Sequence, residues 1–335
     1  MKDYKLPLGL YDLMPAECGE KRGVERALYR NFAAHGYLRV ETPAVEYYDR
    51  FRQGFADEAL FKFTDKDGSL LALRPDMTLP IARLATTKGD LNFPQKYCYV
   101  ASSYSLSDGA GRDREFRQAG VEVIGAKSAF IDADLIALAA ESLLVVGLRD
   151  FLIDIGHAEL NCQGGVDFSL FGGEEVLSRV KGSKKAVAEL EAIYKNLCGM
   201  GYKKYISFDL SGSMGADYYT GIIFKGITKF FGAPILSGGR YDKLVGPAKG
   251  GAGFAIGVRR LTEALRKCGL RTKAVAADIA LGCAAGAELQ AFERAKMLRQ
   301  QGLSVDNTFI TAKAGLEKYA KAKGIAKIEF IAKSI

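Results

Sequence analysis

The stretch from Gly111 to Gly125, GRDREFRQAGVEVIG, constrains the fold more than any other part of the chain. From Phe116 onward apolar and polar residues alternate, which is typical of a β-strand because successive side chains point to opposite faces of a sheet. One face carries small apolar residues and is ordinary sheet core: Ala119, Val121 and Val123. The other face carries two polar residues and a glycine: Gln118, Gly120 and Glu122.

The polar face of this strand admits two interpretations. The amide of Gln118 and the carboxylate of Glu122 stand about 13 Å apart, four residues at roughly 3.3 Å each. Gly120 between them has no side chain, so the surface is a poor core but a good pocket floor for a small ligand that donates to both groups. A solvated outer face of the sheet explains the same residues, and this stretch alone leaves both readings open.

The composition is that of a globular protein and excludes several classes. The 335 residues suffice for one large and one small domain, and no apolar run has membrane-spanning length. The N-terminus lacks the uninterrupted apolar segment of a secretory signal. Six scattered cysteines and two histidines argue against a zinc site or disulfide framework, so we expect no metal, no cofactor and a reducing cytoplasm. The net charge of +8 permits contact with nucleic acid or an acidic partner, but without a dense basic cluster it indicates neither.

The chain up to about residue 270 shows strands of mainly antiparallel type, separated by helices. The expected strands, besides the one from Phe116, lie at 38–40, 61–63, 71–74, 97–103, 151–155, 205–210, 217–225 and 251–256. The expected helices lie at 16–35, from about 78, at 131–146 and after 256. Residues 238–242, GGRYD, are expected to form a tight turn. A helical, Gly- and Lys-rich excursion at about 158–204 suggests an insertion or a less tightly packed segment.

A different pattern follows. From 278 onward strands alternate with helices, which predicts a small parallel sheet with right-handed crossovers. We therefore expect an α+β protein with a core domain at 1–272 and a small α/β domain at 276–335.

Six segments resemble, in the correct order, the core of class II histidyl-tRNA synthetases. They are Thr42-Pro43, LALRPDMT (71–78), GRDREFRQAGVEVIG (111–125), GADYYTGIIF (215–224), SGGRYD (237–242) and GFAIGVRRL (253–261). Each could occur by chance, but the ordered set covers about residues 5–268 and is specific. The resemblance implies a mainly antiparallel sheet flanked by helices. It also implies a homodimeric core, because Thr42-Pro43 falls in the block that forms the dimer interface of that class.

The resemblance places a histidine pocket in this chain. Its expected histidine-binding residues are Asp76, Thr78, Gln118, Glu122, Tyr218, Tyr219 and Tyr241. Carboxylate, hydroxyl and amide oxygens suit an α-ammonium group, and Glu122 with a tyrosine hydroxyl can bind the two imidazole nitrogens. Such a polar site distinguishes histidine from an apolar ring. For a tyrosine considered alone, sheet packing is the plainer explanation.

The departures from the synthetase pattern concern the cations of catalysis. Tyr104 and Met214 stand where the synthetases have arginines, and Leu106 stands where they have a glutamate associated with adenine. Each lost charged donor costs about 3 to 4 kcal/mol in the transition state. Arg112 and Arg260 remain at matching positions, where they could bind an anion or pair with surface carboxylates. The resemblance therefore implies a kept histidine pocket and no catalytic residues.

This combination is similar to a family of non-catalytic paralogues, the regulatory subunits of ATP phosphoribosyltransferase, the first enzyme of histidine biosynthesis. The run YYTGIIF at 218–224 and Ile155-Gly156-His157 match that family better than the synthetases. The resemblance implies a protein that pairs with a short-form catalytic subunit, is needed for its activity and mediates feedback inhibition by L-histidine. It implies a homodimer within a hetero-oligomer.

Two other functions remain open from the sequence. A divergent histidine–tRNA ligase is opposed by Tyr104, Met214 and the short C-terminal part, and an RNA-binding protein could reuse the fold. Residues 276–335 resemble the start of the synthetase anticodon-binding domain but stop after three expected strands and two expected helices. Their lysines are not interleaved with aromatic residues, which favours a solvated face over a tRNA contact.

Overall fold

A computed structural model describes residues 5–52, 54–90, 93–106, 113–160, 167–180, 182–211, 218–246, 249–270 and 276–333. The chain divides into two compact units, 1–272 and 273–335. Among the described residues no helix combines the length and the apolar character that crossing a membrane requires.

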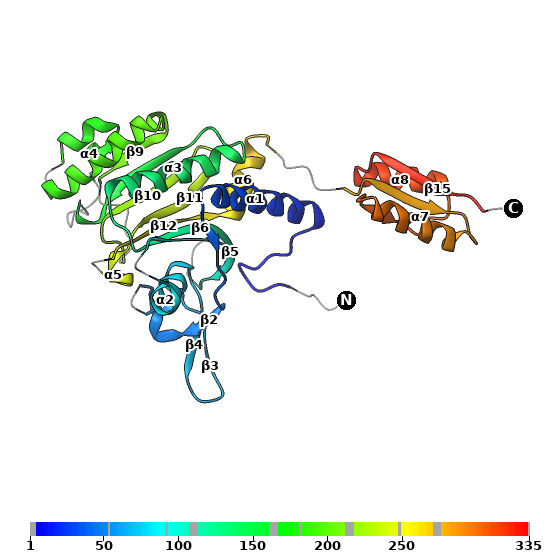
Figure 1. The fold of residues 1–335 in the computed structure, drawn as a ribbon, viewed down its shortest axis with the longest axis horizontal. Helices are drawn as coiled ribbons and strands as arrows, with labels where there is room; N and C mark the ends of the chain where they lie inside the picture. The colour runs from blue at the N-terminus through cyan, green and yellow to red at the C-terminus, as the bar shows by residue number, and fades with distance from the viewer. Residues whose placement is uncertain are drawn as a thin grey trace. The chain divides into compact units, whose positions relative to one another are not determined.

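A nine-stranded sheet forms the centre of the first unit (Figure 1). Its strands, in spatial order, are β1 (Leu38–Arg39), β5 (Gln95–Tyr104), β6 (Glu115–Ile124), β12 (Gly251–Gly257), β11 (Phe231–Arg240), β10 (Ile222–Thr228), β7 (Leu152–His157), β9 (Ile206–Asp209) and β8 (Phe171–Gly172). All neighbours pair antiparallel except β1 with β5 and β7 with β9. The predicted α+β fold with a mainly antiparallel sheet is confirmed.

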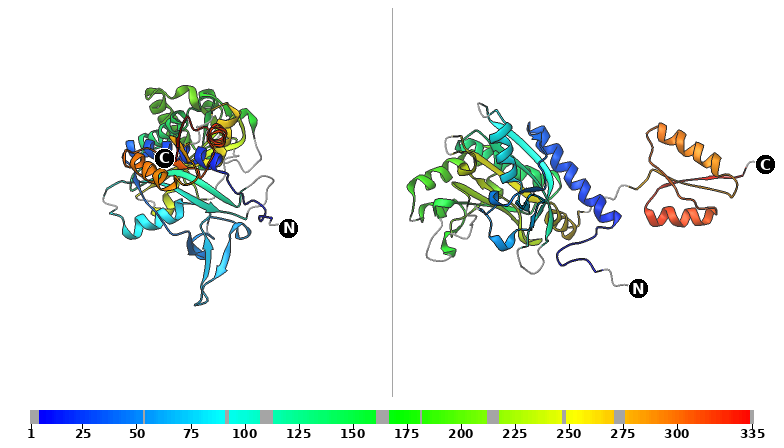
Figure 2. Two further views of the ribbon diagram at one scale, coloured as in Figure 1. Left: turned by 90° about the vertical axis from the view of Figure 1, so that its right-hand side faces the viewer. Right: turned by 90° about the horizontal axis from the view of Figure 1, so that it is seen from below.

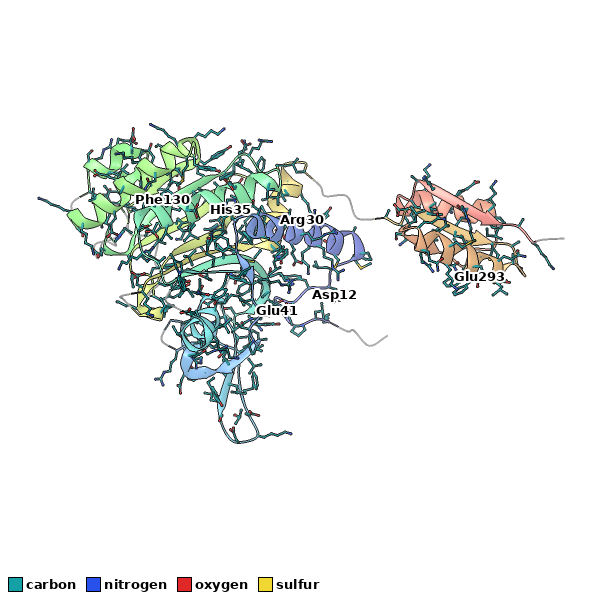
Figure 3. The ribbon with its side chains drawn as sticks, viewed as in Figure 1. Asp12, Arg30, His35, Glu41, Phe130 and Glu293 are labelled. Atoms are coloured by element: carbon teal, nitrogen blue, oxygen red, sulfur yellow. The ribbon has the colours of Figure 1, made fainter. Side chains whose placement is uncertain are left out.

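Helices cover both faces of this sheet. One face packs against α1 (Pro15–Ala34), α3 (Ala129–Val145), α4 (Lys184–Gly199) and α6 (Val258–Lys267). In α1 the residues Val24, Leu28 and Phe32 recur every fourth position and are all buried, as the helical period requires. At the end of α1, His35 lies 2.7 Å from the carboxylate of Glu141 in α3 (Figure 3).

The other face of the sheet carries α2 (Thr78–Lys88) and the short α5 (Asp242–Val245). Leading into α2 is a small antiparallel sheet of β2 (Val45–Tyr47), β4 (Leu70–Leu73) and β3 (Lys62–Thr64). The predicted hairpin of β3 and β4 is confirmed. Its turn needs Gly68, whose φ of 87° is costly for any residue with a Cβ. Single 3-10 turns lie at Tyr48–Arg50, Asp57–Ala59, Ala158–Leu160, Phe168–Leu170, Glu174–Ser178 and Lys203–Tyr205.

Two local expectations need correction. Gly238 and Gly239 belong to β11 and do not form a tight turn. Glycine is needed at 238 because a Cβ there would lie 2.5 Å from both the Phe224 ring and the Gly253 carbonyl oxygen. These glycines therefore allow close packing within the sheet. The described part of 158–204 is not loosely packed either, since α4 buries Leu190 in the main core.

The second unit is a three-stranded parallel sheet with one helix on each face (Figure 2, right). Its strands run in the order β14 (Val305–Asn307), β13 (Ile279–Cys283) and β15 (Lys327–Ile331). Its helices are α7 (Glu288–Gln300) and α8 (Lys313–Lys323), each with an apolar cluster of its own. Coverage of both faces is what a parallel sheet requires.

Candidate functional site

Six of the seven expected histidine-binding residues line one small cavity in the first unit. Asp76 and Thr78 come from the start of α2, Gln118 from β6, and three tyrosines from the chain before β10 and after β11: Tyr218, Tyr219 and Tyr241. The cavity measures about 50 Å³. Small-molecule pockets are usually roughly 300 to 1,000 Å³, so this conformation of the site is nearly closed.

The seventh residue, Glu122, lies at the base of this cluster and is 1% exposed. The hydroxyl of Thr78 donates a hydrogen bond of 2.9 Å to its Oε1, and the hydroxyl of Tyr241 donates to its Oε2. Burial raises the pKa of Glu122 to about 8, against the lowering effect of both hydrogen bonds, and the nearby charge of Asp76 raises it further. Near neutral pH the Glu122 carboxyl is therefore largely protonated.

Gly253 in β12 makes room for this carboxylate. It stands directly opposite Glu122 in the sheet, and a Cβ there would lie 1.9 Å from Glu122 Oε2. The regular spacing of glycines in β12 could have indicated that Gly253 makes room for another side chain. Which side chain it is depends on the register of β12 with β6, and the sequence alone does not give that register.

The expected bare floor between Gln118 and Glu122 is wrong in one respect. Tyr99 of β5 stands opposite Gly120, and a Cβ at Gly120 would lie 2.5 Å from its hydroxyl oxygen. An aromatic ring laid over a cross-strand glycine shields the exposed backbone. The floor of the cavity is therefore the ring of Tyr99, a site residue that sequence reasoning missed.

Asp76 precedes α2 and faces the same cavity. Its Oδ1 accepts a hydrogen bond of 3.3 Å from the backbone N–H of Leu79, in the first turn of the helix. Its Oδ2 is buried and has no hydrogen-bond partner among the described residues. Burial raises the pKa of Asp76 to about 7. A buried oxygen without a donor is costly, so this atom is a ready acceptor for a ligand N–H.

The tyrosines form the walls and offer hydroxyl donors. The rings of Tyr218 and Tyr219 lie 4.7 Å apart between centroids. A Cβ at Gly239 would lie 2.8 Å from the Tyr219 ring, so this glycine too is required by a site residue. Burial raises the pKa of Tyr241, and its hydroxyl stays protonated at any physiological pH. The amide oxygen of Gln118 accepts a hydrogen bond of 3.2 Å from the hydroxyl of Ser103.

Of the two expected anion-binding residues, the structure describes only Arg260. Arg112 lies outside the described residues, as does Met214. Arg260 lines a second cavity of about 210 Å³ that also contacts Gln118, and its Nη1 donates to the Pro234 carbonyl oxygen at 2.8 Å.

Two further arginines line this second cavity, and each is engaged by a carboxylate. Arg259 Nε lies 2.6 Å from Asp113, and Arg117 Nε lies 2.9 Å from Glu25. An arginine that is paired with a carboxylate attracts an anionic ligand less strongly than an unpaired one.

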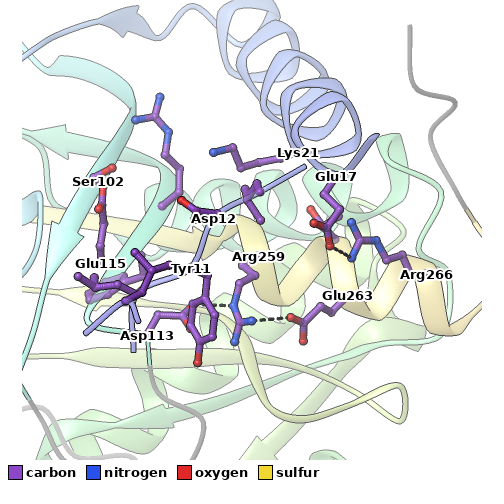
Figure 4. A pocket seen from close by; sticks show the side chains of 16 residues that line it. Tyr11, Asp12, Glu17, Lys21, Ser102, Asp113, Glu115, Arg259, Glu263 and Arg266 are labelled. Atoms are coloured by element: carbon purple, nitrogen blue, oxygen red, sulfur yellow. Dashed lines mark hydrogen bonds and ion pairs between the residues drawn. The ribbon is translucent and has the colours of Figure 1, made fainter. Parts of the chain in front are cut away.

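A larger cavity of about 480 Å³ lies beside the second one, lined by residues of the N-terminal segment, α1, the start of β6 and α6 (Figure 4). Its arginines are paired too, Arg259 with Asp113 and Glu263 and Arg266 with Glu17. Among the described residues there is no group of three or more His, Cys, Asp or Glu side chains that could hold a metal ion.

Comparison with known proteins defines the class first. The family model described as Histidyl-tRNA synthetase matches residues 9–163 and 164–261. A crystal structure of an ATP phosphoribosyltransferase regulatory subunit/histidyl-tRNA synthetase from Bacillus halodurans superimposes with a TM-score of 0.83 at 25% identity, covering 99% of each chain. Apo histidyl-tRNA synthetase from S. aureus gives a TM-score of 0.78 at 25% identity, covering 98% of this chain and 90% of that one. The fold is that of the class II histidyl-tRNA synthetases, as predicted.

Sequence relatives narrow this class. The ATP phosphoribosyltransferase regulatory subunit of Caldanaerobacter subterraneus subsp. tengcongensis is 36% identical over 353 residues, covering 90% of this chain and 93% of that protein. The chain belongs to the family of ATP phosphoribosyltransferase regulatory subunits, which confirms the family predicted from the sequence.

Proposed function

We propose that this protein is a non-catalytic subunit that senses L-histidine and transmits its presence to a short-form ATP phosphoribosyltransferase catalytic subunit. In the proposed complex it activates the catalytic subunit and carries the feedback inhibition of histidine biosynthesis. Membership of the regulatory-subunit family supports the partner. Histidine as the ligand is supported by two neighbouring carboxyl groups set among hydroxyl donors: Asp76, which lines the cavity, and the buried Glu122 at its base.

The chemistry of these groups suits histidine. The unpartnered Oδ2 of Asp76, with Thr78 and Gln118, would accept the hydrogens of the α-ammonium group. Glu122 and the hydroxyl of Tyr241 would bind the imidazole nitrogens, since a carboxyl group and a phenol can each accept or donate. An amino acid with an apolar ring would offer no hydrogen-bond partner to these polar groups and would bind much more weakly.

The size of the cavity implies a conformational change on binding. About 50 Å³ is too small for an amino acid, so the lining must move outward to admit one. Tyr218 and Tyr219 are partly exposed, whereas Tyr241 is 1% exposed, and its backbone N–H donates to the Gly251 carbonyl oxygen at 2.8 Å. We expect the first two to move. A ligand that favours the open arrangement shifts its population, and this is what a regulatory subunit needs.

The charges around the second cavity support the proposal that the subunit is not catalytic. Tyr104 takes the place at which the synthetases carry an arginine. It stands opposite Glu115 in the register of β5 and β6. The ion pairs of Arg117 and Arg259 further reduce the attraction for phosphates. We propose a homodimer within a hetero-oligomer in the cytoplasm. Free thiols at the described cysteines support a reducing compartment: Cys18, Cys98, Cys198, Cys268 and Cys283.

Calorimetric titration of the purified chain with L-histidine tests the ligand. We expect saturable binding that is abolished by Glu122→Ala and kept by Glu115→Ala, which removes an exposed carboxylate from the same strand. Absence of binding, both alone and with the catalytic subunit, would refute histidine sensing. ATP-dependent pyrophosphate exchange with histidine would instead favour a divergent histidine–tRNA ligase.

A further inference from the structure

A buried arginine lies behind the proposed histidine pocket. Arg240, the last residue of β11, is 4% exposed and is held between two carboxylates. Its Nη2 lies 2.5 Å from Asp132 Oδ1 in the first turn of α3, and its Nη1 lies 3.0 Å from Asp242 Oδ1. Nη1 also donates to the Ala126 carbonyl oxygen at 3.4 Å.

Such a buried ion cluster is weak evidence for stability by itself. Removing charges from water costs several kcal/mol per ion in general, and well-packed apolar residues often stabilise a core as well or better. A role in fixing local geometry is therefore worth testing, and the contacts of Arg240 show which geometry it fixes.

Arg240 and Asp242 flank Tyr241, whose hydroxyl donates to Glu122. Asp242 Oδ1 also accepts from the backbone N–H of Gly251 at 3.0 Å, which ties the segment to the start of β12. The direction of the Tyr241 side chain is thus set from both neighbours in sequence.

The main chain of Arg240 and Asp242, together with the side chain of Arg240, contacts the segment that carries the other two tyrosines. The backbone N–H of Thr220 donates to the Arg240 carbonyl oxygen at 2.7 Å, and the Thr220 hydroxyl accepts from the N–H of Asp242 at 3.0 Å. The Arg240 stem packs on Gly221, where a Cβ would lie 3.2 Å from its Cδ. Thr220 directly follows Tyr218 and Tyr219.

We propose that Arg240 is a positioning residue for the histidine pocket: it aligns Tyr241 with Glu122 and anchors the segment of Tyr218 and Tyr219. This inference rests on the proposed function and assigns that site a residue outside its lining. Arginine is required because its planar fork binds two carboxylates at once, whereas a lysine ammonium is a point charge with different geometry.

The variant Arg240→Lys separates positioning from charge. It keeps the cation between Asp132 and Asp242, but a single ammonium cannot reproduce both contacts. We expect the histidine dissociation constant to rise at least tenfold. The matched control is Asp154→Asn, which perturbs a buried carboxyl bonded to Ser207 on the strands β7 and β9, outside the pocket. The histidine dissociation constant of Asp154→Asn should stay within twofold of that of the unaltered protein.

A second readout does not depend on histidine. In protein labelled with 3-fluorotyrosine, the ¹⁹F signal of Tyr241, assigned by its loss in Tyr241→Phe, reports the hydrogen bond to Glu122. We expect this signal to shift in Arg240→Lys and to stay in place in Asp154→Asn. Should Arg240→Lys fail to fold, the isosteric Asp132→Asn variant takes its place.

The outcomes are distinguishable. Unchanged affinity together with an unshifted Tyr241 signal overturns the positioning role and leaves the proposed function standing. Equal loss of affinity in Asp154→Asn also overturns it, because general loosening would then explain the result. If the unaltered protein binds no histidine, the proposed function fails, and the ¹⁹F signal alone decides whether Arg240 aligns Tyr241.

Discussion

Replacing Glu122 by glutamine should remove a large part of the pH dependence of stability. Burial raises the pKa of the Glu122 carboxyl in the folded protein to about 8, whereas the ordinary value for the unfolded chain is 4.5. Between these values the folded protein binds more protons than the unfolded chain, so the free energy of unfolding falls as pH rises. Glutamine has nearly the same shape and does not titrate, and the two hydroxyls that contact Glu122 can also bond an amide.

The magnitude follows from the two pKa values. A tenfold difference in proton affinity corresponds to about 1.4 kcal/mol, so the complete effect of Glu122 approaches about 5 kcal/mol. Most of it, about 4 kcal/mol, develops between pH 5 and pH 9. Since folded domains have only about 5 to 15 kcal/mol of stability, this loss is large.

Urea unfolding of the unaltered protein and Glu122→Gln across that pH range measures the effect. We expect the two proteins to diverge steadily with rising pH, the variant being relatively more stable at pH 9, with equal m-values. Asp76, whose pKa burial raises to about 7, contributes in the same direction in both proteins, so the difference between the two profiles reports Glu122 together with its coupling to Asp76. Parallel pH profiles would show that the Glu122 carboxyl is not held protonated by burial, and the reasoning about the site would be wrong.

Three further predictions concern packing. Gly120→Ala should lower the free energy of unfolding by about 1 to 3 kcal/mol in urea titrations, because the new Cβ would overlap the ring of Tyr99 on the neighbouring strand. Gly253→Ala should lower it at least as much and should shift the Glu122 carboxyl in NMR spectra, since the new methyl meets that carboxylate at 1.9 Å. Leu316→Ala, at a fully buried position in the second unit, should cost about 2 to 5 kcal/mol in the unfolding transition of that unit, whereas the exposed Lys318→Ala should leave it unchanged.

The sequence predicted β6 well because its period is short and local. Ala119, Val121 and Val123 all face the core and are at most 5% exposed, as the alternation required. The cavity itself could not be predicted in the same way. Its floor depends on Tyr99 lying opposite Gly120, a match between two strands that only the register of the sheet determines.

The wrong turn at 238–242 has the same origin. Two consecutive glycines followed by Arg240, Tyr241 and Asp242 look locally like a chain reversal. In the sheet these glycines instead make room for two aromatic rings, Phe224 of the neighbouring strand β10 at Gly238 and Tyr219 of the segment before β10 at Gly239. Arg240 and Asp132 are in contact but lie 108 residues apart in the sequence. No local pattern could therefore indicate that residues 238–242 contribute to a buried ion cluster.

The charge state of the site connects recognition with regulation. In the nearly closed arrangement burial raises the pKa of Glu122 to about 8 and that of Asp76 to about 7, so near neutral pH Glu122 is mostly protonated and Asp76 is about half protonated, and the two carboxyls are seldom both charged. An ammonium group bound at Asp76 would favour the ionised form of that carboxyl, whose Oδ1 accepts from the backbone N–H of Leu79 at the start of α2. Ligand and proton would then compete for the same oxygens, and each favours a different arrangement of the lining. A subunit with two such arrangements can report histidine to a partner, because its affinity for the ligand differs between them.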